Sequence, residues 1–435
     1  MTFLVLFLAA NYLSANNIDS LDFKFNSATT DEKITLLFEK LPELEREYPD
    51  SIFYYIQALE EVGVKEERED VLAYTNYYFG IYLSDKSLLD EAEIKLNQAR
   101  SFFDYTENDS ILSELSNVEG TIHFRRGDLM KAEEQFLLSM DYGKKSNKPR
   151  FKYLAYANLA RVYIIQEEFD KAEELIEEYI QFNKEDDFVK KVASGYSLLG
   201  QLYMDQGTIN MQKNGNEDII DQQMIDKAVI NFEKSLELFL ADGSPLQVAN
   251  GYTNIAISCY FKESPDKALN YFQLALRYRL KSENDFHIAE SYHNLGDFYY
   301  GTNQYDSALV NYQKAVDVGL ASDNKLAVSD AYKQMAEVYG KTQEFQKQTD
   351  VLKTYIDIRE SILKERSSKE LAILRMSYES DKEQLKLAGH QREEILRERV
   401  SDIETVWKNW VWILSGCILL AVVLLTCRRL RVKEA

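Results

Sequence analysis

The chain has 435 residues, with 72 acidic and 51 basic side chains and a formal net charge of −21. Because phosphate contacts need clustered Lys and Arg, this balance argues against nucleic acid as a partner of the main body of the chain. The three cysteines show no metal-ligand spacing, and only Cys259 lies outside the apolar C-terminal segment. We therefore expect no disulfide in the main body, no metal site and no cofactor.

The N-terminal part is predicted to contain two segments. Residues 1–15 resemble a secretory signal, with an apolar stretch from Phe3 to Ala10 and a possible cleavage point after Ala15. They lack the basic residues that usually begin such a signal, so an uncleaved segment is the alternative. Residues 16–70 are predicted to be irregular helices that cap the domain that follows.

Residues 71–360 repeat with a period of 40 residues, except for one interval of 56 residues that carries a 16-residue insertion. An alanine anchors each repeat, at Ala92, Ala132, Ala172, Ala228, Ala268 and Ala308. Without the insertion, a glycine or alanine stands twelve residues earlier, at Gly80, Gly120, Ala160, Gly200, Ala256 and Gly296. A bulky apolar residue stands four residues after each anchor, from Leu96 to Tyr312. Such fixed spacing predicts about seven stacked helix pairs, the last of them degenerate around Ala336 and Gln348.

Two of these units carry the clearest motif. Residues 294–315 read N-L-G-D-F-Y-Y-G-T-N-Q-Y-D-S-A-L-V-N-Y-Q-K-A, and residues 158–179 read N-L-A-R-V-Y-I-I-Q-E-E-F-D-K-A-E-E-L-I-E-E-Y. This pattern resembles the tetratricopeptide repeat (TPR), whose usual period is about 34 residues. The resemblance implies an all-α TPR solenoid, a right-handed superhelix of helix pairs, here with longer helices and a 40-residue period.

Residues 207–226 hold the insertion, within the fourth unit. The segment is polar and lacks the ligand spacing of a calcium-binding loop. We therefore expect a loop that decorates the solenoid.

The resemblance also implies a ligand groove lined by the first helix of each unit. Two positions before the glycine or alanine column, three units carry an asparagine: Asn158, Asn254 and Asn294. In peptide-binding members of the family an asparagine here binds the backbone of an extended ligand, because an amide both donates and accepts hydrogen bonds. Neighbours in the same register would supply specificity: Arg161, Tyr260, His293, Asp297 and Tyr300. The alternative is that these are solvated polar residues without a ligand.

Residues 361–407 are predicted to form a long charged helix. Leu371, Leu374, Tyr378 and Leu385 follow the spacing of a heptad seam, which favours a parallel coiled coil and a homodimer. A single helix stabilised by i,i+4 charge pairs is the alternative.

The C-terminal residues predict a membrane anchor. Trp410 to Cys427 is a run of 18 residues without a charge, which is enough for one transmembrane helix within residues 408–427. Residues 428–435 form a basic tail, and basic flanks favour the cytoplasmic side. The predicted localisation is therefore the cytoplasmic (inner) membrane, crossed once, with the repeats outside the cytoplasm and the C-terminus inside.

Residues 367–387 resemble the segment before the transmembrane helix in bacterial tetratricopeptide-repeat sensors, which continue into a histidine kinase or a LuxR-type DNA-binding domain. This second resemblance implies that the repeats bind a peptide or protein ligand in signal transduction or transcription regulation. The chain contains no catalytic motif, so we expect no enzyme. Two alternatives are a static scaffold for envelope protein complexes and a shortened regulator without its output domain.

Overall fold

A computed structural model describes residues 52–146, 148–185, 188–214, 220–281 and 285–365, together with residues 32, 35, 367, 368, 371, 372 and 397. Every regular element in this described part is a helix, which confirms the predicted all-α class. The predicted signal segment 1–15, membrane helix 408–427 and basic tail 428–435 lie outside the described residues. So does most of the predicted coiled coil over residues 361–407.

Seven helix pairs follow one another, as the repeat predicts, and we number them units 1 to 7. Before them, in the predicted cap, helix α4 (Ile52–Lys65) packs on α5. The pairs are α5 (Glu69–Asp85) with α6 (Leu89–Tyr105), α7 (Asp109–Arg126) with α8 (Leu129–Lys145), α9 (Pro149–Lys152) and α10 (Tyr156–Ile165) with α11 (Phe169–Glu185), α12 (Val189–Asn214) with α13 (Gln222–Asp242), α14 (Pro245–Phe261) with α15 (Pro265–Lys281), α16 (Asp285–Gly301) with α17 (Tyr305–Ala321), and α18 (Lys325–Lys341) with a last helix over residues 345–365.

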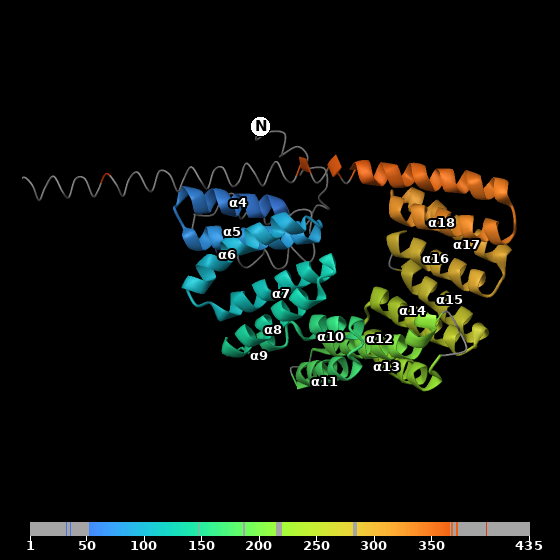
Figure 1. The fold of residues 1–435 in the computed structure, drawn as a ribbon, viewed down its shortest axis with the longest axis horizontal. Helices are drawn as coiled ribbons and strands as arrows, with labels where there is room; N and C mark the ends of the chain where they lie inside the picture. Colours follow the sequence, from blue (N-terminus) through green and yellow to red (C-terminus); the bar gives the residue numbers. More distant parts are fainter. Residues whose placement is uncertain are drawn as a thin grey trace, which may run out of the picture.

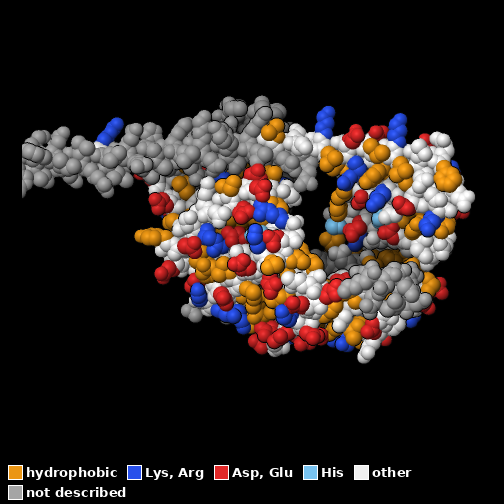
Figure 2. Space-filling view, viewed as in Figure 1, with side chains coloured by type: hydrophobic (Ala, Val, Ile, Leu, Met, Phe, Trp, Pro, Cys, Tyr) orange, Lys and Arg blue, Asp and Glu red, His pale blue; other side chains and the backbone are white. Residues whose placement is uncertain are grey.

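The units form an arc whose two ends lie on opposite sides of a central opening, visible in Figure 1 and in the space-filling view of Figure 2. In units 3 to 6 the first helix lies toward the inner side of the arc and the second toward the outer side (Figure 1). Most packing is between helices that are neighbours in the chain, and first helices of adjacent units, such as α16 and α18, also contact each other. This nearest-neighbour packing is that of a helical repeat solenoid.

The repeated columns of the sequence explain how each pair packs. All six anchoring alanines are fully buried, and their small side chains let adjacent helices approach. At Gly296 a Cβ atom would lie 2.4 Å from the ring of Tyr312, which is the bulky residue of the same unit. The glycine column and the bulky column are therefore the two sides of one contact between the first and second helix.

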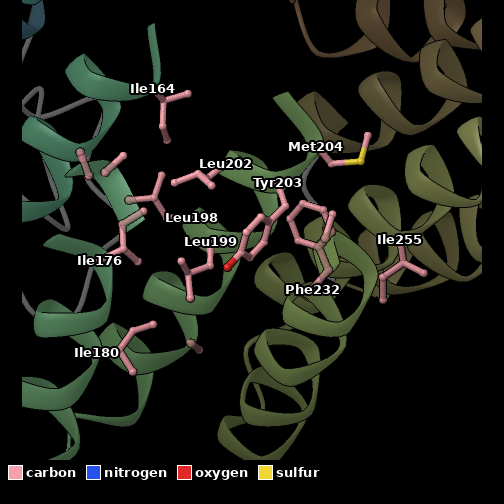
Figure 3. Close-up of a cluster of buried hydrophobic side chains, with 14 of the residues drawn as sticks. Ile164, Ile176, Ile180, Leu198, Leu199, Leu202, Tyr203, Met204, Phe232 and Ile255 are labelled. Atoms are coloured by element: carbon pink, nitrogen blue, oxygen red, sulfur yellow. The ribbon is translucent and has the colours of Figure 1, made fainter. Parts of the chain in front are cut away.

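The buried side chains form a core that continues from one unit to the next. A single connected cluster extends from Ala132 in unit 2 to Phe298 in unit 6. Figure 3 shows its middle part, where Ile176 of α11 lies beside Leu198 of α12, and Tyr203 lies beside Phe232 of α13. No single helix pair could bury these residues alone, which is why the pairs stack.

The insertion in unit 4 is helical over residues 207–214 and 222–226, so the prediction of a loop over the whole of residues 207–226 is wrong. Helix α12 continues to Asn214 and α13 begins at Gln222, which gives 26 and 21 residues, against 17 in each helix from α14 to α18. Two features extend the helices. Ile225 is fully buried, and the Asp221 side chain caps α13 by accepting from the backbone N–H of Met224.

The localisation predicted from the sequence, a single-pass protein of the cytoplasmic membrane, is corrected. Among the described residues no helix combines the length and the apolar character needed to cross a bilayer. Residues 408–427, on which that prediction depended, are not part of this set, and neither the localisation nor the membrane anchor is carried further.

Candidate functional site

The eight predicted groove residues lie on three first helices of the solenoid. Asn158 and Arg161 are on α10, Asn254 and Tyr260 on α14, and His293, Asn294, Asp297 and Tyr300 on α16. Helix α10 is well separated from α16 along the arc (Figure 1). The structure therefore divides the predicted site into two regions, one in unit 3, next to unit 2, and one in units 5 and 6, next to unit 7.

In units 2 and 3 the asparagine amide is already bound by other side chains. Asn158 Nδ2 donates to Asn117 Oδ1 on α7 at 3.0 Å, and Asn158 Oδ1 accepts from Arg161 Nη1 at 3.0 Å. The three residues form a hydrogen-bonded chain that joins two adjacent first helices. Asn158 therefore holds units 2 and 3 together, and this occupies one donor and one acceptor position of its amide.

In units 5 to 7 the equivalent amides are available. The side chains of Asn254 and Asn294 are half-buried and form no hydrogen bond with any residue that the structure describes, and the same is true of Gln334 on α18. Gln334 occupies the same repeat position two residues before the small-residue column. Three consecutive units thus present an unoccupied primary amide on successive first helices.

The neighbours in the repeat explain this difference. Asn158 is bound by the residue three positions later in its own helix and by the residue of the preceding unit that matches Asn117. Around Asn254 these two positions hold Ile257 and Ser197, an apolar group and a much shorter one. Around Asn294 they hold Asp297 and Thr253, whose side chains have other partners. The amides of units 5 and 6 are free because their neighbours cannot reach them or are already bound.

Beside the free amides, unit 6 contains a hydrogen-bonded cluster of three residues. The hydroxyl of Tyr312 donates to Asp297 Oδ1 at 2.7 Å, and Asp297 Oδ2 lies 3.2 Å from His293 Nδ1. The His293 and Tyr312 rings are in edge contact, with centroids 5.5 Å apart. The cluster depends on Gly296, because only a residue without a side chain lets the Tyr312 ring reach the inner face.

The environment shifts two pKa values in this cluster. Burial by itself would lower the pKa of His293, but the hydrogen bond to Asp297 and the charges of Asp297 and Asp330 outweigh it and raise the pKa above its ordinary value. Burial, together with the charge of Asp297, raises the pKa of Tyr312, so its hydroxyl stays protonated and donates.

The two predicted tyrosines have mainly packing roles. The Tyr260 ring packs against Phe298 in the next unit, with centroids 6.3 Å apart. The Tyr300 ring lies 6.0 Å from that of Tyr305 at the start of α17. Both are half-buried, so they shape the surface around the amides while contributing to contacts within and between units.

Sequence reasoning missed three residues of this region. The asparagine column of the sequence leaves out Gln334, although its side chain ends in the same amide. Tyr312 was assigned to packing alone, and Asn117 was not considered. A signal for Tyr312 was present: in unit 6 alone the bulky column carries a hydroxyl and the residue after the glycine is an aspartate.

The free amides of this region are suited to hydrogen bonding with a ligand. No group of three His, Cys, Asp or Glu residues in the described part of the chain could hold a metal ion. A primary amide offers two donors and two acceptor lone pairs, which match the N–H and C=O of a peptide backbone. Two charged side chains in this region, Asp297 and Asp330, are exposed on adjacent first helices.

Comparisons with known proteins agree with the fold. A family model described as soluble NSF attachment protein, SNAP, matches residues 220–370, and a tetratricopeptide repeat model matches residues 153–186. No curated protein matches the chain. Among solved structures, the apo form of the quorum sensor NprR from B. thuringiensis is similar with a TM-score of 0.55 and 12% identity, over 79% of this chain and 92% of that chain.

A second solved structure is a signal transduction ATPase with a tetratricopeptide repeat sensor, from Pyrococcus horikoshii. It is similar with a TM-score of 0.54 and 17% identity, over 83% of this chain and 53% of that chain. At these identities the likeness is one of fold. Fold, repeat columns and the family match together make this chain a helical repeat protein of the tetratricopeptide type.

Proposed function

We propose that this protein binds an extended peptide, or an extended segment of a protein, on the inner side of the arc in units 5 to 7. In this proposal it is the sensing part of a signal-transduction or transcription-regulatory system and has no enzymatic activity of its own. The observation that carries the proposal is the set of three unoccupied amides, Asn254, Asn294 and Gln334, on successive first helices.

The spacing of these amides supports an extended ligand. Packed helices lie about 8–10 Å apart, and an extended chain advances about 3.3–3.6 Å per residue. The amides of α16 and α18, which are in contact, would therefore meet a peptide backbone about two to three residues apart. Contacts of this kind read the backbone, so affinity would come from the amides, and preference among peptides from Asp297, Asp330 and His293 beside them.

The similarity to a quorum sensor adds only that this fold can support sensing. The identity of 12% is too low to infer that this chain binds the same ligand. Nothing in the proposal depends on the individual residues of that protein.

A second candidate is a scaffold that binds folded proteins on the rim of the arc. It is favoured by exposed leucines at the repeat spacing in the last turns of α13, α15 and α17: Leu240, Leu280 and Leu320. The same position in units 1 to 3 holds Asp104, Lys144 and Lys184. The apolar rim is thus confined to the later units, where the family model of an attachment protein also matches.

Selection from a displayed library of random peptides on the full-length protein tests the first candidate. Selected peptides should bind the wild-type protein and lose affinity when Asn254 and Asn294 are both replaced by Ala. They should bind the Leu240→Lys, Leu280→Lys, Leu320→Lys variant unchanged. If the rim variant loses the peptides and the asparagine variant keeps them, the groove proposal is wrong and the rim is the binding surface.

A further inference from the structure

A cavity lies at the junction of units 1 and 2, well separated along the arc from the free amides of units 5–7 (Figure 1). Its volume of about 330 Å³ is at the lower end of the usual range for small-molecule sites, about 300–1,000 Å³. Three consecutive helices line it: α6 of unit 1 and both helices of unit 2, α7 and α8. The apolar core is divided here, because Ile122 in the cavity wall is the last residue of one buried cluster and the next cluster begins at Ala132.

The sequence departs from the repeat at this junction. The position eight residues after the anchoring alanine holds Arg100 in unit 1 and an apolar residue in each of units 2 to 6. The position just before the glycine or alanine column holds Glu119 in unit 2 and an apolar residue in every other unit. Ser116 stands where units 3 to 7 carry a tyrosine. Two charged side chains and one small polar side chain thus occupy positions that are otherwise apolar or aromatic.

These three residues bind one another. Arg100 donates from Nε and Nη2 to the two carboxylate oxygens of Glu119, at 3.2 and 2.7 Å, and from Nη2 to Ser116 Oγ at 3.0 Å. Glu119 and Ser116 are buried. A buried ion pair in the place of well-packed apolar residues does not in general stabilise a fold. A gain in stability therefore does not explain why the repeat changes here.

Both carboxylates in the cavity wall are paired with an arginine. Glu119 is bound by Arg100, and Glu93 accepts a hydrogen bond from Arg126 Nη1 at 2.6 Å. A charged ligand would find no unpaired opposite charge on these groups, and burying its own charge would cost free energy. The wall is therefore suited to a ligand without a net charge.

The wall also has hydrogen-bonding groups without a partner. The side-chain amides of Asn97 and Gln135 form no hydrogen bond with any residue that the structure describes, and the Oε1 atom of Gln135 is buried. The Nη1 atom of Arg100 likewise donates to none of the described residues. A buried acceptor without a partner is unfavourable, so a molecule that donates to Gln135 would gain free energy.

A hydroxyl group matches this wall, because it donates one hydrogen bond and accepts two through the same atom. The N–H groups of the amides and the guanidinium would donate to it, and the amide oxygens would accept from it. A compact ring with several hydroxyl groups also presents C–H groups, which can contact the apolar side chains in the wall, Ile122 and Leu138.

We propose that this cavity binds a small uncharged molecule rich in hydroxyl groups, of the sugar or cyclitol type. Its hydroxyl groups bond to Asn97, Gln135 and Nη1 of Arg100. Because the wall comes from units 1 and 2, the bound molecule links these two units and leaves the inner side of units 5–7 open. The site is therefore independent of the peptide-binding function proposed above.

Saturation-transfer NMR with the full-length protein tests this site. The uncharged probes are glucose, galactose, N-acetylglucosamine and myo-inositol, and the charged analogues are glucosamine and glucuronate. At least one uncharged probe should bind. Both charged analogues should bind at least about tenfold more weakly than that probe, because the wall offers no unpaired opposite charge on its carboxylates.

Two substitutions test the residues that bind the probe. Gln135→Leu and Asn97→Leu should each weaken binding by about tenfold or more, because each removes hydrogen bonds to the hydroxyl groups. Both variants should fold, since leucine occupies the same repeat positions in units 3 and 2, at Leu175 and Leu137. The matched control is Gln313→Leu, which removes an exposed amide at the repeat position of Asn97 but in unit 6, and should leave binding unchanged.

Thermal unfolding of the three variants verifies that each is folded. The proposal is overturned if none of the uncharged probes binds, or if glucosamine or glucuronate binds more tightly than all of them. It is also overturned if Gln313→Leu weakens binding as much as Gln135→Leu does.

Discussion

The inner faces of unit 3 and of units 5 and 6 carry the same side chain, an asparagine, at the same repeat position, and they use it differently. In the first region Asn158 is tied to Asn117 and Arg161 and joins two helices. In the second region Asn254 and Asn294 have no partner among the described residues. The difference lies in the residues around the asparagine, not in the asparagine itself. A repeat column therefore identifies where a ligand-binding side chain can be, and the neighbouring columns decide whether it is available.

The largest expected effect is on peptide affinity in units 5–7. Each lost amide contact to a desolvated backbone group costs about 1–3 kcal/mol, so replacing both Asn254 and Asn294 by Ala should weaken a selected peptide by about 100-fold. Asn158→Ala, the matched change in the other region, should weaken it by less than about threefold. Fluorescence anisotropy with a labelled selected peptide measures both.

If Asn158→Ala weakened the peptide as much as the double replacement of Asn254 and Asn294, the two regions would not differ in function. Asn158 would then release Asn117 and Arg161 and bind the ligand. Thermal unfolding of both variants serves as a control, because a general loss of structure would lower affinity without involving the amides.

The next effect is on the free energy of unfolding in unit 6. Gly296→Ala places a Cβ atom 2.4 Å from the Tyr312 ring, and the ring must move away from Asp297 to accommodate it. Overpacking of this kind costs about 1–3 kcal/mol. The corresponding position in unit 3 is Ala160, where Ala160→Gly should cost about 1 kcal/mol or less through helix propensity. Urea unfolding of the two variants gives the comparison.

If Gly296→Ala were neutral, Tyr312 would not be fixed against the inner face by this contact. The cluster of His293, Asp297 and Tyr312 would then need another explanation.

The sequence predicts most of the fold because the same packing contacts recur in each repeat. The alanine and glycine columns mark where helices touch, and all seven units follow from them. The columns do not predict the structure of an insertion. Residues 207–226 read as a polar loop, whereas α12 continues to Asn214 and α13 begins at Gln222, three residues before the buried Ile225.

The candidate site is only partly predictable for a related physical reason. Register places Asn158, Asn254 and Asn294 on the inner face, but hydrogen bonding across units depends on side-chain reach. That reach differs between Arg161 and Ile257, which occupy the same position in units 3 and 5.

A smaller loss of peptide affinity is expected when Asn254 in unit 5 is given the neighbours that Asn158 has in unit 3. Replacing Ser197 by Asn and Ile257 by Arg gives Asn254 the two partners that occupy Asn158. We expect the selected peptide to bind about threefold to tenfold more weakly, because the hydrogen bonds of Asn254 within the protein must first be exchanged. The reverse change, Asn117→Ala with Arg161→Ala, should free Asn158 without weakening the peptide. Unchanged affinity in the first variant would contradict the view that neighbours control amide availability.

The smallest effect is a pH dependence confined to unit 6. The folded-state pKa of His293 lies above its ordinary value of about 6.5, so protonated His293 stabilises the fold. This contribution is complete below that ordinary value and is lost as the pH rises through the folded-state pKa. Between about pH 6 and pH 8 the wild-type protein should therefore lose more stability than His293→Gln, in which all other titrating groups remain. Urea midpoints across this range measure the difference, and Asp297→Asn should reduce it because the main partner charge is gone. Identical pH profiles for the wild-type protein and His293→Gln would mean that Asp297 and Asp330 do not hold the proton on His293. Units 5–7 would then differ from units 2–3 in their free amides alone.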